Sequence, residues 1–188
     1  MIKAIITDFD GTLVDTYYAN ECAYKEAFTM CGHNLTSDDY KKYFGLRFDA
    51  FMNAVGIHDA GTRNKIAEIK KAVYPEYFHM LKVNNLLLRT LMTLKNDGVK
   101  IAIATTARRE NLMNALNYLG IADKFDLILA GDVVKNGKPD PEIYILAMEQ
   151  LGISPDDTLI YEDSKVGLQA AKDSGAHYIQ ITKTWFEI

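Results

Sequence analysis

The amino-acid sequence predicts an α/β fold in which a doubly wound parallel sheet is interrupted by an inserted all-helical cap domain. Two observations predict the sheet: short apolar runs rich in β-branched residues recur along the chain, and helical patterns separate them. A third observation predicts the insertion, because residues 16–83 carry helical periodicity and no strand pattern. We therefore expect an α/β core built from residues 1–15 and 84–188, and a cap built from residues 16–83.

The first predicted strand covers residues 2–9 (IKAIITDF), where few polar residues alternate with apolar ones. Such a run is typical of a parallel strand that is covered on both faces. Four further runs of this kind occur at residues 100–106, 125–131, 158–163 and 177–181. Their alternation with helical patterns is typical of a Rossmann-like, doubly wound sheet.

The helices between these strands have recognisable ends. Glycines are expected to terminate four of them, at Gly98, Gly120, Gly152 and Gly175. Asp140 and Pro141 predict the start of a helix, with Asp140 as the N-cap and the proline in the first turn. Ser164 is expected to cap the last helix.

The inserted segment is rich in aromatic residues. It contains seven of the eleven tyrosines and five of the eight phenylalanines of the chain. Apolar residues at helical spacing, such as Ile66, Ile69 and Val73, predict an amphipathic helix within it. An aromatic-rich helical insertion of this length is expected to form a small core of its own.

Composition and charge restrict the class of protein. The 188 residues are 48% hydrophobic and 24% charged, an ordinary balance for a soluble globular protein. The net charge of −4, without a block of Lys and Arg, argues against a nucleic-acid-binding surface. No apolar run approaches the roughly 20 residues that cross a bilayer, and the N-terminus lacks the form of a signal peptide. Cys22 and Cys31 are expected to be free thiols, so we predict a cytoplasmic protein without a membrane partner.

Chemically reactive side chains occur where the predicted strands end. In open parallel sheets, ligands bind beyond the carboxyl ends of the strands. The candidates, in chain order, are Asp8, Asp10, Gly11, Thr105, Thr106, Lys138, Glu162 and Asp163. Carboxylates, hydroxyls and a lysine are therefore expected to converge on one edge of the sheet.

Each of these groups also has a purely structural interpretation. Asp10 before glycine is a common turn, Thr105 is a suitable helix cap, and Lys138 before proline is a typical loop lysine in water. Asp163 next to Ser164 is consistent with helix capping. The joint occurrence of these groups, each at the end of a strand, favours a functional site. Asp8 and Asp10 in particular face the same side of an extended chain, where their charges repel unless a cation lies between them.

Four short motifs resemble those of the haloacid dehalogenase superfamily of phosphohydrolases. The sequence DFDGTLVDT at residues 8–16 resembles the first motif, and Thr105 falls at the second. Lys138, within GKPDP, resembles the lysine of the third motif, and YEDS at residues 161–164 resembles the acidic fourth motif. The helical insertion resembles the small cap that this family places between its first and second motifs.

The resemblance implies a Mg²⁺-dependent phosphatase that acts on a small phosphorylated metabolite. It implies that Asp8 is the nucleophile and forms an aspartyl-phosphate, and that Asp10 is the general acid and base. The implied magnesium ligands are Asp8, the carbonyl of Asp10 and Asp163, with Glu162 close by or contributing. Thr105, Thr106, Lys138 and Gly11 would bind the phosphoryl group, with Lys138 also neutralising Asp8.

Asp10 also indicates the branch of the superfamily. The dehalogenases and the phosphonate-cleaving members lack an aspartate at this position, so phosphate-ester chemistry is favoured. β-Phosphoglucomutase and its relatives carry a cap histidine roughly where Asn20 stands, and a cap arginine near Arg47. We therefore rank a phosphatase first, a phosphomutase second, and a non-enzymatic phosphate- or partner-binding protein third. Tyr17, Asn20 and Arg47 are the cap residues expected to meet the substrate, and the oligomeric state stays open.

Overall fold

The computed structural model describes residues 1–186, which form two compact units. The core unit consists of residues 1–15 and the chain from residue 82 onward, and the cap unit is Thr16–Leu81. The second boundary lies two residues before the expected one because β3 (Lys82–Val83) pairs antiparallel with β2 (Val14–Asp15). The expectation of no strand within residues 16–83 is therefore wrong, since a two-residue strand is too short to give a sequence pattern.

The core unit contains a five-stranded parallel sheet. Its strands are β1 (Ala4–Thr7), β4 (Lys100–Ala104), β5 (Leu127–Leu129), β6 (Thr158–Glu162) and β7 (His177–Gln180). Their order is β5-β4-β1-β6-β7, so the chain leaves β1 on one side and later returns to it on the other. Strand β1 is thus the switch point of a doubly wound sheet, which is the place where such sheets bind ligands. The predicted fold class is confirmed.

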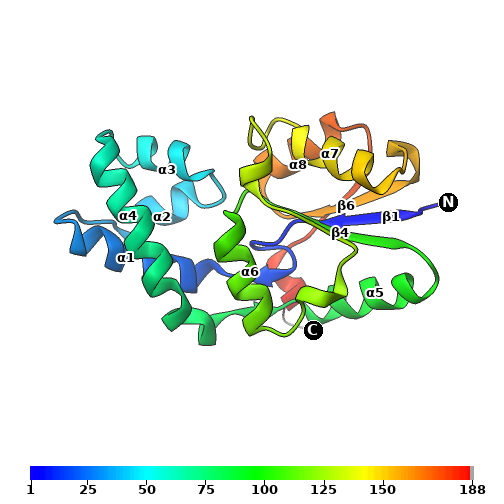
Figure 1. Cartoon of the computed structure of the whole chain (residues 1–188), viewed down its shortest axis with the longest axis horizontal. Helices are drawn as coiled ribbons and strands as arrows, with labels where there is room; N and C mark the ends of the chain where they lie inside the picture. The colour runs from blue at the N-terminus through cyan, green and yellow to red at the C-terminus, as the bar shows by residue number, and fades with distance from the viewer. Residues whose placement is uncertain (187–188) are drawn as a thin grey trace. The chain divides into compact units, whose positions relative to one another are not determined.

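Helices cover both faces of this sheet. Figure 1 shows α7 (Glu142–Leu151) and α8 (Lys165–Asp173) on one face, and α5 (Asn85–Asn96) and α6 (Arg109–Tyr118) on the other. The shorter 3-10 helices of the core unit are η2 (Ala122–Lys124), η3 (Gly131–Val133), η4 (Pro155–Asp157) and η5 (Lys183–Phe186). Every residue of β1 is buried, which explains the absence of polar alternation in its sequence. Strand β7, by contrast, is exposed along its length at one edge of the sheet.

The helix ends predicted from glycines and caps are largely confirmed. Each of the four predicted glycines lies within two residues of a helix end and has a positive φ. Ser164 Oγ accepts a hydrogen bond from the Gly167 N–H at 3.0 Å, so it caps α8. Helix α7 begins one residue later than predicted, after Pro141, but Asp140 Oδ1 still accepts from the Glu142 N–H at 3.0 Å.

The cap unit consists of helices around an aromatic core. Its helices are α1 (Tyr17–Met30), α2 (Ser37–Tyr43), α3 (Phe48–Ala54), α4 (Ala60–Val73) and η1 (Tyr74–Met80). Phe28, Tyr40 and Phe51 are buried together, and the Tyr24 ring lies 5.1 Å from that of Phe51. Within residues 1–186, no helix combines the length and apolar character that a membrane crossing requires.

Candidate active site

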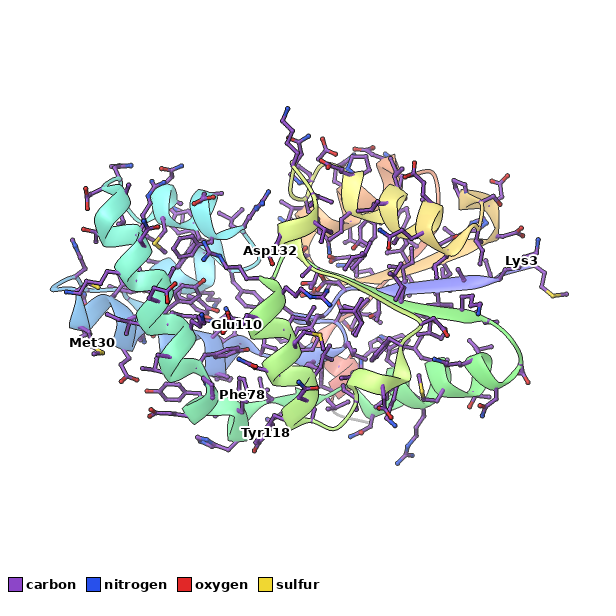
Figure 2. All side chains as sticks on the ribbon, viewed as in Figure 1. Lys3, Met30, Phe78, Glu110, Tyr118 and Asp132 are labelled. Atoms are coloured by element: carbon purple, nitrogen blue, oxygen red, sulfur yellow. The ribbon has the colours of Figure 1, made fainter. Side chains whose placement is uncertain are left out.

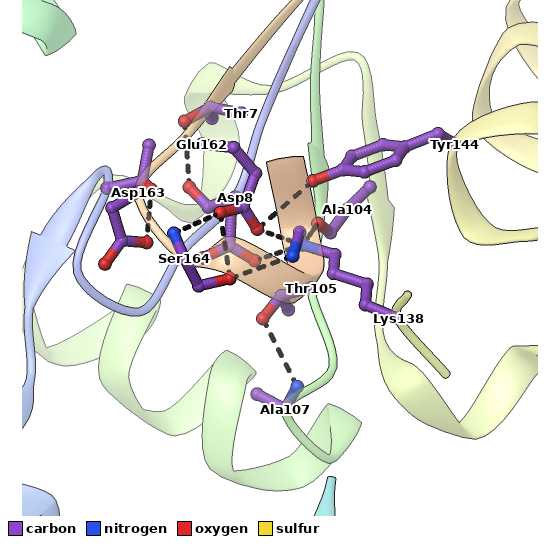
Figure 3. A network of polar contacts seen from close by, with 12 residues as sticks. Thr7, Asp8, Ala104, Thr105, Ala107, Lys138, Tyr144, Glu162, Asp163 and Ser164 are labelled. Carbon is purple, nitrogen blue, oxygen red and sulfur yellow. Dashed lines mark hydrogen bonds and ion pairs between the residues drawn. The ribbon is translucent and has the colours of Figure 1, made fainter. Parts of the chain in front are cut away.

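Asp8 stands directly after β1 and is fixed through its backbone. Its N–H donates to the carbonyl of Tyr161 at 3.0 Å, and its own carbonyl accepts from Thr7 Oγ1 at 2.8 Å. The first of these bonds continues the pairing between β1 and β6 by one residue. The carboxylate of Asp8 is therefore held at the carboxyl edge of the central strand, and its side chain is almost completely buried (Figure 3).

Lys138 joins the ends of three strands, β1, β4 and β6. Its Nζ lies 2.7 Å from Asp8 Oδ1 and 2.7 Å from Glu162 Oε1, and it donates to the carbonyl of Ala104 at 3.2 Å. The lysine is buried, so the alternative of a loop lysine in water is wrong. Burial lowers its pKa, but the charges of Asp8 and Glu162 outweigh burial and hold the pKa well above its usual value. The side chain is therefore an ammonium ion at neutral pH.

Asp163 is held against the loop that follows β1. Its Oδ1 accepts a hydrogen bond from Thr12 Oγ1 at 2.9 Å. Gly11 has a φ of +86°, and a Cβ built on it would overlap the carboxylate of Asp163. A glycine is thus required here for two separate reasons: the left-handed backbone and the close approach of the carboxylate. Asp10 lies in the same loop, bridged to Val14, and its charge acts on Asp8.

Three carboxylates come together at this edge of the sheet. Asp8, Glu162 and Asp163 each offer an oxygen atom, and these atoms lie within 4.8 Å of one another. Burial raises the pKa of Asp8 well above its usual value; Lys138 opposes this, and the charges of Glu162 and Asp163 add to it. Burial, followed by the charge of Glu162, raises the pKa of Asp163 to about 7.

The charges of this cluster match a divalent cation. When all three carboxylates are ionised, the ammonium of Lys138 leaves two negative charges uncompensated. The raised pKa values of Asp8 and Asp163 are the expected result of burying like charges together. Hard carboxylate oxygens at this spacing are the ligands that Mg²⁺ and Ca²⁺ prefer. The donor set therefore fits a divalent metal ion.

Glu162 differs from the other two acids because both of its oxygen atoms have protein partners. Oε1 faces Lys138, and Oε2 accepts from the Ser164 N–H at 2.8 Å and from Ser164 Oγ at 3.2 Å. The Tyr144 hydroxyl donates to Oε1 at 3.3 Å, and a Cβ on Gly167 would overlap the carboxylate. Sequence analysis did not identify Tyr144 or Gly167, since a buried aromatic residue and a glycine on helices are indistinguishable there from ordinary core positions.

The loop after β4 carries the two candidate threonines. Thr105 is buried, donates its N–H to the carbonyl of Leu129 at 3.1 Å, and accepts at Oγ1 from the Ala107 N–H at 3.2 Å. Thr105 does not cap a helix, because the N-cap position of α6 is Arg108; its hydroxyl instead binds the loop that precedes α6. Thr106 packs against Gly131, where a Cβ would lie 2.5 Å from the Thr106 carbonyl oxygen.

The turn after β5 is hydrogen-bonded to the segment that follows Thr105 and Thr106. The Gly131 N–H donates to the carbonyl of Ala107 at 2.8 Å. Asp132, labelled in Figure 2, accepts at Oδ2 from the Arg109 N–H at 2.5 Å at the start of α6. Sequence analysis missed both residues, because their contacts arise only when β4 and β5 lie side by side.

The three cap residues expected to meet the substrate all belong to the cap unit. The Tyr17 ring lies 5.3 Å from that of Tyr40 and 5.1 Å from that of Phe44, so it is part of the aromatic core. Asn20 is buried on α1, and Arg47 is half-buried immediately before α3. A substrate-binding role for Tyr17, Asn20 and Arg47 stays a prediction.

Known proteins resemble this chain along nearly its whole length. The sequence pattern of the family described as "Haloacid dehalogenase-like hydrolase" matches residues 5–181. A "Phosphorylated carbohydrates phosphatase" of Thermotoga maritima is 34% identical over 184 residues, which covers 95% of this chain and 84% of that protein. A "Beta-phosphoglucomutase" of Bacillus subtilis is 28% identical over 184 residues, covering 93% of this chain and 80% of that protein.

A solved structure is also similar to this chain over nearly its whole length. CbbY from Rhodobacter sphaeroides, crystallised in complex with phosphate, superposes with a TM-score of 0.89 at 26% identity. The superposition covers 98% of this chain and 88% of CbbY, and a variant of CbbY was solved with xylulose-(1,5)bisphosphate. The family pattern covers the sheet and all the strand-end residues described above. The chain is thus a hydrolase and belongs to the haloacid dehalogenase-like hydrolase family.

Proposed function

We propose that this protein is a Mg²⁺-dependent phosphatase that hydrolyses a small phosphorylated carbohydrate through an aspartyl-phosphate on Asp8. The observation that carries the proposal is the buried pair of Asp8 and Lys138 beside two further carboxylates. A nucleophilic carboxylate, a cation at its side and an excess of negative charge are what phosphoryl transfer to aspartate requires. The resemblance to a phosphorylated carbohydrates phosphatase supports the substrate class.

Asp8, Asp163 and the backbone carbonyl of Asp10 would hold the Mg²⁺ ion. When bound, the ion would compensate the charge of the carboxylates and of the phosphoryl group. Glu162 is the least available of the acids for this purpose, since its two oxygen atoms already accept hydrogen bonds from Lys138, Tyr144 and Ser164. We therefore propose that Glu162 accepts the hydrogen bond of Lys138, and that Asp163 is a ligand of the metal ion.

The proposed reaction gives a role to each of the remaining groups. A carboxylate oxygen of Asp8 forms a bond to phosphorus while the bond from phosphorus to the leaving oxygen breaks. Asp10 gives its proton to that leaving oxygen. It then takes a proton from a water molecule whose oxygen forms a bond to phosphorus, while the bond from phosphorus to Asp8 breaks and inorganic phosphate leaves. Lys138 neutralises Asp8, while Thr105 and the N–H of Thr106 bind phosphoryl oxygens.

A panel of phosphorylated metabolites tests the proposal. Purified protein is incubated with sugar phosphates, nucleotides and p-nitrophenyl phosphate, with Mg²⁺ or with EDTA, and inorganic phosphate is measured. We expect Mg²⁺-dependent release from one or more sugar phosphates. The absence of release from the entire panel would favour the non-enzymatic, phosphate- or partner-binding alternative.

A phosphomutase is the second candidate. The similarity to a β-phosphoglucomutase over 93% of this chain favours it, whereas Asn20, in place of the cap histidine of those enzymes, argues against it. Phosphorus NMR of the reaction separates the two activities. A phosphatase produces inorganic phosphate in proportion to the substrate consumed, and a mutase produces a new sugar phosphate instead.

The cellular setting is also a proposal. Cys22 and Cys31 are free and half-buried, as expected in a reducing compartment. We therefore place the enzyme in the cytoplasm, with a small metabolite and no nucleic acid as its partner.

Replacing Asp10 by asparagine is expected to slow alkyl phosphates far more than aryl phosphates. Asparagine keeps the size of the side chain but has no transferable proton, and a sugar alkoxide needs protonation more than p-nitrophenolate does. We expect the rate of alkyl phosphate hydrolysis to fall roughly 10²-fold more than the rate of aryl phosphate hydrolysis, the usual scale of acid catalysis. Stopped-flow measurement with p-nitrophenyl phosphate should also show a burst, because the base for the second step is lost. Equal slowing without a burst would leave Asp10 a structural role alone.

Replacing Gly11 by alanine is expected to raise the Mg²⁺ concentration needed for half-maximal activity by tenfold or more. The added Cβ would overlap the carboxylate of Asp163 and push it from its place, and a shift of about 1 Å commonly costs on the order of 10²-fold in rate. Gly98→Ala is the matched control, since Gly98 has a φ of +89° and no atom within 4 Å of the added Cβ. The control should lose stability and keep the Mg²⁺ requirement of the parent. A similar Mg²⁺ requirement in both variants would mean that backbone strain alone explains the glycine at position 11.

A further inference from the structure

We propose that Tyr144 is a positioning residue that keeps the Lys138 ammonium against Asp8, acting through its ring and through Glu162. The inference rests on the proposed function, in which Lys138 neutralises the nucleophile. It adds to that function a residue of α7 that contacts neither Asp8 nor the proposed metal ligand Asp163 through any hydrogen bond found among residues 1–186.

The ammonium of Lys138 is enclosed by defined partners. Its three N–H donors are matched by Asp8 Oδ1, Glu162 Oε1 and the carbonyl oxygen of Ala104. The ammonium lies over the face of the Tyr144 ring, with 4.7 Å between Nζ and the ring centroid; Figure 3 shows the two side chains close together. A cation over an aromatic face is attracted by the ring, most strongly where water is excluded, and both side chains are buried. The ring therefore favours the position of the ammonium that Asp8 requires.

The hydroxyl of Tyr144 binds Glu162, the carboxylate that competes with Asp8 for the Lys138 ammonium. Lys138 lies at 2.7 Å from both Asp8 and Glu162, so the two acids share one ammonium. The Tyr144 hydroxyl donates to Glu162 Oε1, the same oxygen atom that faces Lys138. By supplying part of the hydrogen bonding that this oxygen needs, the hydroxyl reduces the pull of Glu162 on the ammonium. More of the positive charge of Lys138 is then available to Asp8.

Glu162 itself has little freedom to move. Ser164 donates two hydrogen bonds to Oε2, one from its N–H and one from its hydroxyl. On the other side, the carboxylate lies so close to Gly167 of α8 that a Cβ added to this glycine would overlap it. Because the Glu162 carboxylate is held in place, it cannot move to find another donor if the Tyr144 hydroxyl is lost. The position of Lys138 is consequently expected to depend on the Tyr144 hydroxyl and ring separately.

Two variants separate these two parts. Tyr144→Phe removes the hydroxyl and keeps the ring, and we expect kcat to fall roughly three- to tenfold, the scale of one typical intramolecular hydrogen bond. Tyr144→Leu removes both, and we expect a further fall of about tenfold, the scale of a buried cation–ring contact. In both variants the KM should stay close to that of the parent, because Thr105 and the N–H of Thr106, the proposed phosphate-binding groups, are untouched.

Ile143→Val is the matched structural control. Ile143 is buried in the same core cluster and is the neighbour of Tyr144 on α7. This variant should lower the unfolding temperature while kcat stays at the parent value. A fall in kcat with Ile143→Val as large as that with Tyr144→Phe would overturn the proposal, since general loosening of α7 would then explain both.

A measurement without turnover distinguishes failure of this inference from failure of the proposed function. The buried Lys138 ammonium should give a slowly exchanging signal in a proton–nitrogen NMR spectrum, identified by its loss in Lys138→Met. We expect that signal to shift in Tyr144→Phe and to broaden by faster exchange in Tyr144→Leu. Unchanged signals in both variants would overturn the role of Tyr144, whatever the substrate panel shows. An inactive parent protein with shifted signals would overturn the phosphatase proposal alone.

Discussion

Replacing Asp8 by asparagine is expected to lower phosphatase turnover by at least about 10³-fold, which corresponds to ~4 kcal/mol of lost transition-state stabilisation. The amide has nearly the same shape as the carboxylate, and its oxygen atom is still able to accept a hydrogen bond from Lys138. It lacks the charge and the nucleophilic oxygen pair that attack phosphorus. Steady-state rates with the best substrate of the metabolite panel, measured at saturating Mg²⁺, provide the test.

The fold of this variant should persist, because the backbone bonds of Asp8 to Tyr161 and Thr7 do not involve the carboxylate. Asp157→Asn is a suitable control: Asp157 lies outside the strand-end cluster and pairs with Lys3 at 2.6 Å. Acid quenching followed by mass spectrometry should detect phosphorylated protein in the Asp10→Asn background and none when position 8 is also asparagine. More than a few per cent of parental turnover in Asp8→Asn would rule out Asp8 as the nucleophile.

The meeting of Asp8, Lys138, Glu162 and Asp163 was predictable from the sequence. Parallel strands place their carboxyl ends at one edge of a sheet, so residues that follow different strands must lie near one another. Strand β1 lies in the middle of the sheet and Asp8 therefore has β4 on one side and β6 on the other. Local apolar runs and turn signals were sufficient to locate these ends within one to three residues.

Contacts that depend on packing between elements were not predictable. Tyr144 is one of several buried residues on α7, and its contact with Glu162 depends on how that helix lies over the sheet. Gly131 and Gly167 are explained by what an added Cβ would meet, which is a property of three-dimensional neighbours. The pairing of Lys82–Val83 with β2 joins positions that are far apart in the chain and leaves no local pattern.

The cap residues show a further limit of sequence analysis. Tyr17 lies in a segment where aromatic residues are frequent, and frequency alone does not separate a substrate contact from a core contact. The structure gives its ring two partners within the cap, Tyr40 and Phe44. A pattern of residue types thus predicted the aromatic core of the cap better than it assigned single residues within it.

Replacing Asp163 by asparagine is expected to lower the activity of the protein and to raise its stability in the absence of a metal ion. Activity should fall by about 10²-fold or more, or require far more Mg²⁺, because the ion loses one of its proposed carboxylate ligands. The protein in EDTA at pH 8 should nevertheless unfold at a higher temperature than the parent. Asparagine keeps an oxygen atom that accepts the Thr12 hydroxyl, which in the parent lies 2.9 Å from Asp163 Oδ1.

The sign of this stability effect follows from the pKa of Asp163. Burial, followed by the charge of Glu162, raises that pKa from 3.8 to about 7, so the folded state binds the proton more tightly than the unfolded state. Stability that depends on this proton is present below the unfolded pKa and is lost as the pH rises through about 7. At pH 8 the parent therefore carries a half-buried charge that asparagine lacks, whereas near pH 4 the two proteins should differ little.

Adding Mg²⁺ at pH 8 should reverse the order of stability. A ligand that binds only the folded state raises the unfolding temperature as its concentration exceeds its dissociation constant. The parent should gain from this binding because Mg²⁺ compensates the charges of Asp8 and Asp163, and the variant should gain much less. Calorimetry of both proteins, with EDTA and with Mg²⁺, measures all four unfolding temperatures. If the variant is the less stable protein in EDTA at pH 8 and gains as much from Mg²⁺ as the parent, then Asp163 is a helix-flanking residue and the metal ion lies elsewhere.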